Sequence, residues 1–168
     1  MPVDPDVLAK AREYIGYAGP IRSHVVTEKE IHRFSLSIGD KNPLYRDDEF
    51  AKRNGSEGII GPPMSHCLYN LPADDLDKLD DAGLGPNMGP RFEVPVPGFP
   101  GAVAGGRDID FGPPFRPGDV IAVQETVVDV YEKEGRMGPM IFIISDFTYK
   151  NQRGEMAVRD RQTLIRHK

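Results

Sequence analysis

The first predicted element follows from the spacing of apolar side chains near the start of the chain. Residues 4–16 show helical spacing, and Asp4, Pro5 and Gly16 suit the cap, the first position and the end of a helix. Its apolar face would consist of Val7, Leu8, Ala11 and Ile15. We therefore expect residues 1–20 to form a helical arm that docks on the rest of the protein.

A second helix is predicted over residues 28–38, after a brief strand over 23–26. Thr27 suits its N-cap, Glu30 is placed three residues later as the reciprocal partner of a capping box, and Gly39 ends the helix. The apolar positions at helical spacing are Ile31, Phe34 and Ile38. These three side chains are expected to form the face that packs on the core.

A third helix is predicted over residues 62–79, where a Pro-Pro pair suits the first turn. The apolar repeat consists of Met64, Leu68 and Leu71. Pro72 must break or kink this helix. Residues 80–106 are rich in Gly and Pro and lack periodicity, so we expect a long ordered loop or an interface arm there.

The apolar pattern changes to a period of two in the last third of the chain. Strands are predicted over 107–111, 120–131, 140–150 and 155–166, joined by Gly- and Pro-containing turns. The first half of 140–150 is nearly all apolar, as expected for a central strand covered on both faces. An antiparallel meander that packs on an apolar helix makes the fold class α+β, with residues 1–168 in one domain.

Composition and charge exclude several classes of partner and site. The net charge of -5 gives no electrostatic basis for binding nucleic acid, and no apolar run approaches the roughly 20 residues needed to span a membrane. The N-terminus has no signal-peptide pattern, so we expect a cytoplasmic protein. Cys67, the single cysteine, excludes an internal disulfide and is interpreted as a small buried apolar residue, with a catalytic thiol as the alternative. No His/Cys spacing predicts a metal site.

The polar segment GDKNPLYRDDEFA, residues 39–51, follows the second helix directly. On local grounds Asp40 is a turn or cap residue, and Tyr45 is a packing residue. The run from Asp47 to Glu49 suits the start of a short helix, because acidic side chains favour the first turn. The segment AGGRDID, residues 104–110, is not a phosphate-binding loop, since a strand follows the glycines instead of a helix.

Three segments together resemble the MaoC-like hotdog dehydratases and hydratases, of the N-terminal or fatty-acid-synthase-like dehydratase type. They are SIGDKNPLYRDDEFA, GSEGIIGPPMSHC and AGGRDIDFGPPFRPGD, and they occur in the family's order. The resemblance implies a single hotdog fold, in which an antiparallel sheet wraps around one long helix. It also implies that two hotdog units pair, either as a homodimer or with a sister subunit.

The resemblance also implies the chemistry of the site. Active members use an aspartate and, five residues later, a histidine to add water to an enoyl thioester or to remove it. Asp40, Asn42 and Pro43 match that motif, but Tyr45 takes the place of the histidine, and a phenol with a pKa near 10 is a poor base at neutral pH. The segment that would bind the acyl thioester comprises Ile60, Gly61, Pro62, Pro63, Met64 and Ser65, with backbone amides near Met64–His66 available to polarise the carbonyl. Arg107 would contact a phosphate of the carrier.

Three functions follow from this pattern. The chain is expected to shape the acyl tunnel of an enoyl-thioester hydratase or 3-hydroxyacyl-thioester dehydratase while a partner hotdog supplies the Asp/His pair. One alternative is a non-catalytic acyl-CoA-binding homodimer. The other is a self-sufficient hydratase that uses Asp40 with His66, or a thioesterase that uses an acidic residue. No cofactor is expected beyond the substrate, a thioester of CoA or of acyl carrier protein, and the acyl group itself is left open.

Overall fold

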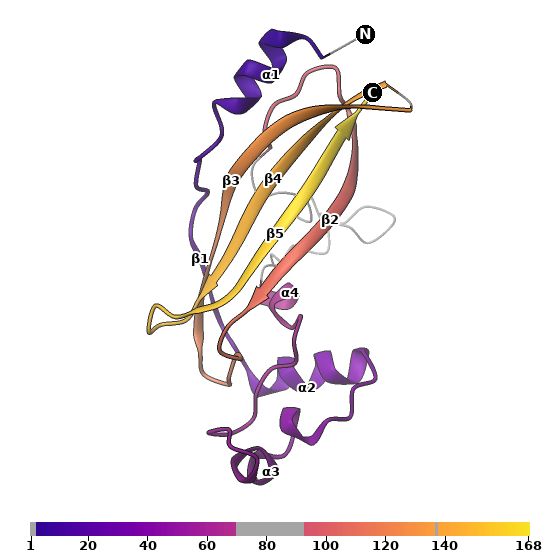
Figure 1. Cartoon of the computed structure of the whole chain (residues 1–168). Helices are drawn as coiled ribbons and strands as arrows, with labels where there is room; N and C mark the ends of the chain where they lie inside the picture. Colours follow the sequence, from indigo (N-terminus) through magenta and orange to yellow (C-terminus); the bar gives the residue numbers. More distant parts are fainter. Residues whose placement is uncertain (1–2, 70–92, 137) are drawn as a thin grey trace, which may run out of the picture.

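The described part of the protein forms one antiparallel sheet of five strands in the order β1-β3-β4-β5-β2 (Figure 1). The computed structural model describes residues 3–69, 93–136 and 138–168. The strands are β1 (Arg22–Val25), β2 (Gly101–Phe111), β3 (Val120–Gly135), β4 (Gly138–Lys150) and β5 (Met156–His167). The antiparallel sheet that the resemblance implies is therefore confirmed, and the short links between β3, β4 and β5 form the predicted meander.

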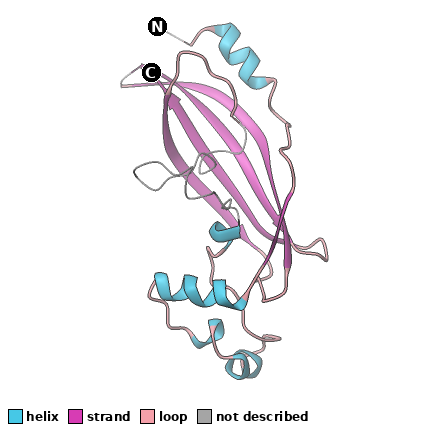
Figure 2. Ribbon diagram, turned by 180° about the vertical axis from the view of Figure 1, so that it is seen from behind, coloured by secondary structure: helices cyan, strands magenta, loops and turns pink. Residues whose placement is uncertain are grey.

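The helices lie at the ends and on one face of the sheet (Figures 1 and 2). They are α1 (Pro5–Arg12), α2 (Glu28–Ser37), the 3-10 turn η1 (Pro43–Tyr45), α3 (Asp48–Arg53) and α4 (His66–Tyr69). Helix α1 lies at one end of the sheet, whereas α2 and α3 form a small lobe at the other end. No helix within the described ranges is long and apolar enough to cross a membrane.

The core lies on one face of the sheet, because buried and more exposed side chains alternate along strands β3 and β4. In β3 and β4 every second side chain is buried over most of the strand. Strand β4 is central, as predicted, but its other face is only half-buried in the single chain, so cover on both faces is not found. One cluster packs Tyr149 and Ile121 with Ile31, and a second packs Leu8 and Ala11 of α1 against β3 and β4.

The capping box predicted for α2 is present, but its apolar face is only partly buried. The Thr27 hydroxyl accepts from the Glu30 amide at 3.2 Å, and the Glu30 carboxylate accepts from the Thr27 amide at 2.9 Å. Ile31 is fully buried, whereas Ile38 is 54% exposed. The expectation for Ile38 is wrong because α2 ends at Ser37 and the chain turns away from the core at Gly39, where φ is +70°.

Two boundaries differ from the sequence-based expectation. Helix α4 begins at His66, four residues later than the predicted start at Pro62, and the expected continuation over 70–79 lies outside the described residues. Strand β2 begins at Gly101, so residues 101–106 are strand and not loop. Gly105 explains why this stretch lacks a strand pattern: a Cβ there would lie 2.7 Å from the Thr163 methyl group of β5, so the close pairing excludes a side chain.

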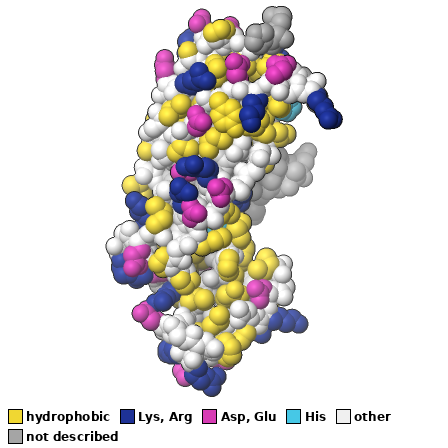
Figure 3. All heavy atoms as spheres, in the orientation of Figure 1, with side chains coloured by type: hydrophobic (Ala, Val, Ile, Leu, Met, Phe, Trp, Pro, Cys, Tyr) yellow, Lys and Arg dark blue, Asp and Glu magenta, His cyan; other side chains and the backbone are white. Residues whose placement is uncertain are grey.

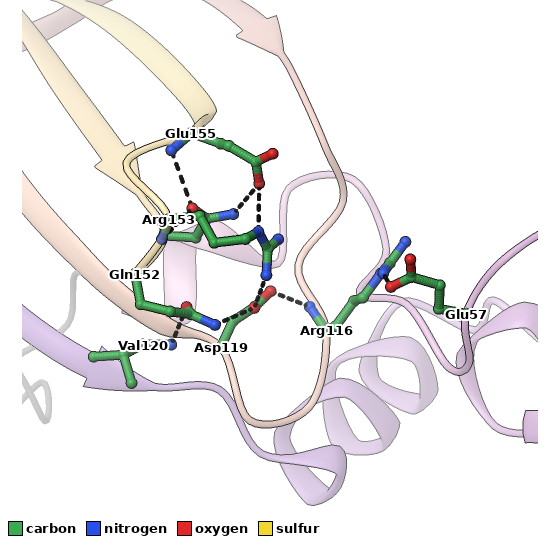
Figure 4. A network of polar contacts seen from close by, with 8 residues as sticks. Glu57, Arg116, Asp119, Val120, Gln152, Arg153 and Glu155 are labelled. Carbon is green, nitrogen blue, oxygen red and sulfur yellow. Dashed lines mark hydrogen bonds and ion pairs between the residues drawn. The ribbon is translucent and has the colours of Figure 1, made fainter.

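The turn before β3 is tied to the β4–β5 turn by polar contacts around Asp119 (Figure 4). The buried Asp119 carboxylate accepts from the Arg116 amide at 2.9 Å and from the Gln152 side chain at 3.2 Å. Gln152 accepts in turn from the Val120 amide at 2.9 Å. Arg116 also pairs with Glu57 in the segment that follows α3. The Asp119 contacts therefore join the two turns at this end of the sheet, and the Arg116–Glu57 pair reaches the segment after α3.

Candidate functional site

A cavity of about 200 Å³ lies between the lobe and the sheet. Most of its lining is apolar, and Figure 3 shows hydrophobic side chains gathered where the lobe meets the sheet. The lining residues are Tyr45, Ile60, Gly61, Pro62, Pro63, Met64, Phe111, Gly112, Pro113, Pro114, Phe115, Ala157 and Val158. The cavity thus brings together four segments that are separated in the sequence. Three of them belong to the motifs on which the family resemblance rests, and the fourth belongs to β5.

The cavity wall is held by backbone contacts between these segments. The Ile60 amide donates to the Leu44 carbonyl at 3.1 Å, next to Tyr45, and the Gly61 amide donates to the Phe115 carbonyl at 2.7 Å. A Cβ at Gly61 would lie 2.9 Å from the Ser65 hydroxyl and 3.4 Å from Phe115, so only glycine fits this approach. Glycine here allows the 59–63 segment to lie directly against the turn that precedes β3.

Tyr45 is part of this wall and is 7% exposed. Asn42 caps the turn that carries it, because the Asn42 side chain accepts from the Leu44 amide at 3.1 Å, and Pro43 occupies the first position of that turn. Burial and the nearby negative charge of Asp40 raise the pKa of the Tyr45 phenol. The phenol therefore stays neutral at physiological pH and offers a hydrogen-bond donor in place of a base.

Asp40 lies at the exposed rim next to Tyr45. Its carboxylate accepts from the Asn42 amide at 2.9 Å, which is the local turn contact expected from the sequence. No hydrogen bond or ion pair joins Asp40 to His66, although both are described. A joint role of Asp40 and His66 in a self-sufficient hydratase stays a prediction.

The chain enters α4 through a left-handed residue. Met64 has φ +71°, the only positive φ of a non-glycine residue in the described ranges. Within those ranges the Met64 and His66 amides donate to no backbone carbonyl, whereas the Ser65 amide donates to the Pro62 carbonyl at 3.1 Å. Met64 lines the cavity and Ser65 is fully buried behind Gly61. The strained turn therefore lies at the cavity wall, as backbone strain often does at functional sites.

His66 lies in a buried polar cluster beside the cavity. Its Nε2 atom is 3.5 Å from the Asp160 carboxylate, and both side chains are fully buried. Arg107 pairs with Asp160 through its Nε at 3.0 Å and also through a terminal nitrogen, and Gln162 donates to the same carboxylate at 2.8 Å. The His66 ring packs edge-on against Tyr149, with ring centres 5.1 Å apart. The partner of His66 is thus Asp160 of β5.

The charges of this cluster stabilise one another. Burial opposes ionisation of Asp160, but hydrogen bonds from His66, Arg107 and Gln162 outweigh it and hold the pKa of this carboxyl well below its usual range. Burial likewise opposes protonation of His66, but its contacts with Asp160 and Cys67 raise the pKa of the imidazole. The Arg107 guanidinium pairs with Asp160 while its side chain stays 37% exposed, and the expected contact with a carrier phosphate stays a prediction.

Cys67 differs from the expectation of a small buried apolar residue. The side chain is half-buried, and its sulfur lies 4.0 Å from His66 Nε2 and 3.7 Å and 3.8 Å from the two terminal nitrogens of Arg107. Hydrogen bonding to His66 lowers the pKa of the thiol, partly opposed by burial, and Arg107 adds to the lowering. The flanking apolar residues gave no indication of these contacts, because Arg107 comes from a distant strand.

Sequence reasoning missed Asp160 and the aromatic residues of the cavity wall. Asp160 shares one face of β5 with Val158 and Gln162, and the period-two pattern was the signal that this face points inward. The charge of Asp160, however, suggested a surface position. Phe111 and Phe115 lay within the quoted strand-and-turn motif without being singled out. Across residues 3–69, 93–136 and 138–168, no group of three or more His, Cys, Asp or Glu side chains is arranged to hold a metal ion.

Comparison with known proteins identifies the family. The sequence matches the family described as FAS1-like, dehydratase domain region, over residues 13–160. It is 30% identical over 139 residues to a probable enoyl-CoA hydratase alpha subunit of Thermomonospora curvata, covering 81% of this chain and 43% of that protein. It is 27% identical over 129 residues to a UPF0336 protein of Thermobifida fusca, covering 76% and 77% of the two chains. This chain thus spans less than half the length of the Thermomonospora protein.

The solved structures that resemble the chain are hotdog proteins. A chain of the ChsH1-ChsH2 complex from Mycobacterium tuberculosis superimposes with a TM-score of 0.72 and 21% identity, covering 97% of this chain and 95% of the other. A chain of the HadBC (3R-hydroxyacyl-ACP dehydratase) complex from the same organism gives 0.62 and 16%, covering 90% and 96%. These structures show the fold. The match over residues 13–160 shows that this chain, whose hotdog fold these structures share, belongs to the FAS1-like dehydratase domain region family of MaoC-like proteins.

Proposed function

We propose that this chain is the acyl-binding subunit of an enoyl-thioester hydratase or 3-hydroxyacyl-thioester dehydratase, and that a partner hotdog subunit supplies the Asp/His pair. The observation that carries the proposal is Tyr45. It stands at the family's histidine position, forms part of an apolar cavity wall, and has a raised pKa that keeps it neutral. An acyl chain would be bound there without a base to activate water.

The size of the cavity supports a half-site. Pockets that enclose a small-molecule ligand usually measure roughly 300 to 1,000 Å³, and the cavity of this chain is smaller, at about 200 Å³. Its apolar lining suits hydrocarbon, because burial of each CH₂ group contributes about 0.8 kcal/mol. A second subunit would extend the cavity and complete the substrate site.

The edge of the sheet supports a pairing partner. Strand β2 runs over Gly101–Phe111 and ends the sheet order, so one side of its backbone has no neighbouring strand among the described residues. Long exposed edges of this kind favour pairing with another chain. Phe111, at the end of this edge, is 53% exposed and also lines the cavity, so a partner on β2 would lie next to the acyl site.

Two preparations test the division of labour. The chain purified alone and the chain co-expressed with a hotdog subunit that carries an intact Asp-x4-His motif are assayed for hydration of crotonyl-CoA and of longer enoyl-CoA substrates. We expect negligible turnover for the chain alone and activity for the complex, because acid/base help is worth on the order of 100- to 10,000-fold in rate. High activity of the chain alone would refute the proposal.

A substitution in the cavity wall tests whether the acyl group binds to this chain. Ile60→Asp in the cavity wall should weaken activity of the complex and raise KM for long acyl chains most, because a charge in an apolar cavity costs several kcal/mol. Ile21→Asp, at an exposed isoleucine outside the cavity lining, is the control. Equal effects of both substitutions would mean that the acyl group does not occupy this cavity. Acyl-CoA binding without turnover in any complex would favour the non-catalytic homodimer.

A further inference from the structure

The acyl cavity has an open side and a closed side. Phe111 is 53% exposed, and residues 112–114 after it are exposed as well, so this stretch forms the mouth. Six other lining residues are buried and form the floor; they are Tyr45, Gly61, Pro62, Phe115, Ala157 and Val158. The mouth lies at the end of the β2 edge, where a partner subunit would extend the cavity. The floor is therefore supplied by this chain.

Phe115 is an aromatic residue of the floor that is held from behind. Its ring packs edge-on against Tyr69, with ring centres 5.0 Å apart, and against Tyr149, with ring centres 6.5 Å apart. Both tyrosines are buried. The Phe115 carbonyl accepts from the Gly61 amide at 2.7 Å, which fixes the backbone as well. Because close-packed cores yield little, the cavity that this ring bounds has a fixed depth.

The volume of the cavity limits the acyl group that it can hold. An apolar cavity of roughly 150 Å³ holds one benzene molecule, which has six carbon atoms. On the same scale, a cavity of about 200 Å³ has room for about eight carbon atoms. A long-chain or fused-ring acyl group exceeds this volume.

Resting on the acyl-binding function proposed above, we propose that this half-site selects short- to medium-chain acyl groups of up to about eight carbon atoms, and that Phe115 sets the limit. The partner supplies the Asp/His pair at the mouth, so the thioester lies there and the tail of the acyl group points to the floor. Each CH₂ group that enters the cavity improves binding about fourfold until the tail meets Phe115. Further CH₂ groups find no room and add nothing to the affinity.

A series of saturated acyl-CoAs tests the limit without turnover. Butyryl-, hexanoyl-, octanoyl-, decanoyl- and dodecanoyl-CoA are titrated calorimetrically into the full chain and into its complex with the partner hotdog subunit. We expect the affinity to rise about 15-fold for each two-carbon step up to octanoyl-CoA, and less than about threefold over the two steps beyond it. A rise that continues at the same rate to dodecanoyl-CoA would overturn the proposal.

Two variants of the floor should move the limit in opposite directions. Phe115→Leu shortens the side chain at the end of the cavity, so the step from octanoyl- to decanoyl-CoA should regain a rise of about 10-fold. Ala157→Leu fills part of the cavity, so the rise should already stop at hexanoyl-CoA. Phe99→Leu is the matched control, since Phe99 is also 4% exposed but packs in the cluster of α1 and does not line the cavity.

These variants stay decisive if one of them fails to fold. Folding is checked by circular dichroism, and without a folded Phe115→Leu protein the Ala157→Leu series decides. An unchanged limit in the folded floor variants, or an equal shift in Phe99→Leu, would remove the role of the floor.

The limit and the proposed function fail in different ways. If the chain alone proved catalytic, the division of labour would fail, but the limit would still be measured by binding. If affinity rose without limit while Ile60→Asp still weakened binding, the acyl site would stand and only the limit would fall. If Ile60→Asp left the affinity unchanged at every chain length, the acyl group would lie elsewhere, and both proposals about the cavity would be wrong.

Discussion

Tyr45 is the residue on which the proposed separation of binding from catalysis depends. The turn that presents it is intact, because Asn42 caps it and Pro43 begins it as the family motif requires. The side chain nevertheless packs as a wall residue, with a phenol that stays neutral. The turn to which the resemblance assigns the base is therefore present, with a phenol in place of the imidazole.

Restoring the imidazole tests this separation. We expect Tyr45→His to raise hydration of crotonyl-CoA by the isolated chain at least about 100-fold over wild type, because it returns a group that titrates near neutral pH beside Asp40. Tyr45→Phe is the control, since it removes the phenol and adds no base. If the folded histidine variant is no faster than the phenylalanine variant, the chain lacks more than the base.

The residues of the site differ in how far the sequence could predict them. The cavity wall from Ile60 to Met64 was predictable because it lies within one contiguous motif. The pairing of His66 with Asp160 was not, because it depends on strand register, which places Asp160 opposite Phe147 of β4. Local patterns carry no information about which distant strand supplies a partner.

Among the elements, the turns before β3 and after β4 act together through Asp119. The sequence indicated both turns separately by their Gly, Pro and Asn content, and both are present. Their connection was not predictable, since the Gln152 and Arg116 contacts to one carboxylate require the sheet to be formed. Strand β2 shows the same limit, because its Gly-rich first half becomes strand only by pairing with β5.

Removal of this connection should destabilise the lobe and the sheet together. Asp119→Ala leaves the Arg116 amide without its acceptor in a buried setting, and we expect a loss of about 1–3 kcal/mol in the free energy of unfolding, measured by urea titration. Glu57→Ala is the matched control from the same network, because Glu57 is 83% exposed and an exposed ion pair contributes roughly 0–1 kcal/mol. Equal losses for the two variants would show that the buried carboxylate has no special role.

At the scale of the whole molecule, buried acidic groups act in opposite directions on stability. Asp160 is held ionised by its partners, so stability is lost as the pH falls below the ordinary range of a carboxyl group. Glu125, which is 6% exposed on the inner face of β3, has its pKa raised by burial from 4.5 to about 6. The contribution of Glu125 to the free energy of unfolding is fully present below pH 4.5 and is lost as the pH rises through about 6.

Glu125→Gln should remove the loss of stability that accompanies ionisation of Glu125. Because the variant cannot ionise, we expect it to be more stable than wild type by on the order of 2 kcal/mol at pH 7, with little gain at pH 4. Thermal unfolding across this pH range measures the difference. Glu134→Gln, at the exposed end of the same strand, is the control and should change stability little at either pH. A Glu125→Gln variant no more stable than wild type at pH 7 would contradict the role given to Glu125.

The sheet order also has a consequence for the sequence of folding events. Strands β3, β4 and β5 follow one another through short turns, so their pairing closes small loops and can form early. Strand β1 must find its partner across most of the chain, since Arg22 pairs with Val123. The helices of the lobe are synthesised before the strands on which they pack. The cavity joins Tyr45 to residues 60–64 and 111–115, so its closure requires contacts between distant segments, which favours late formation.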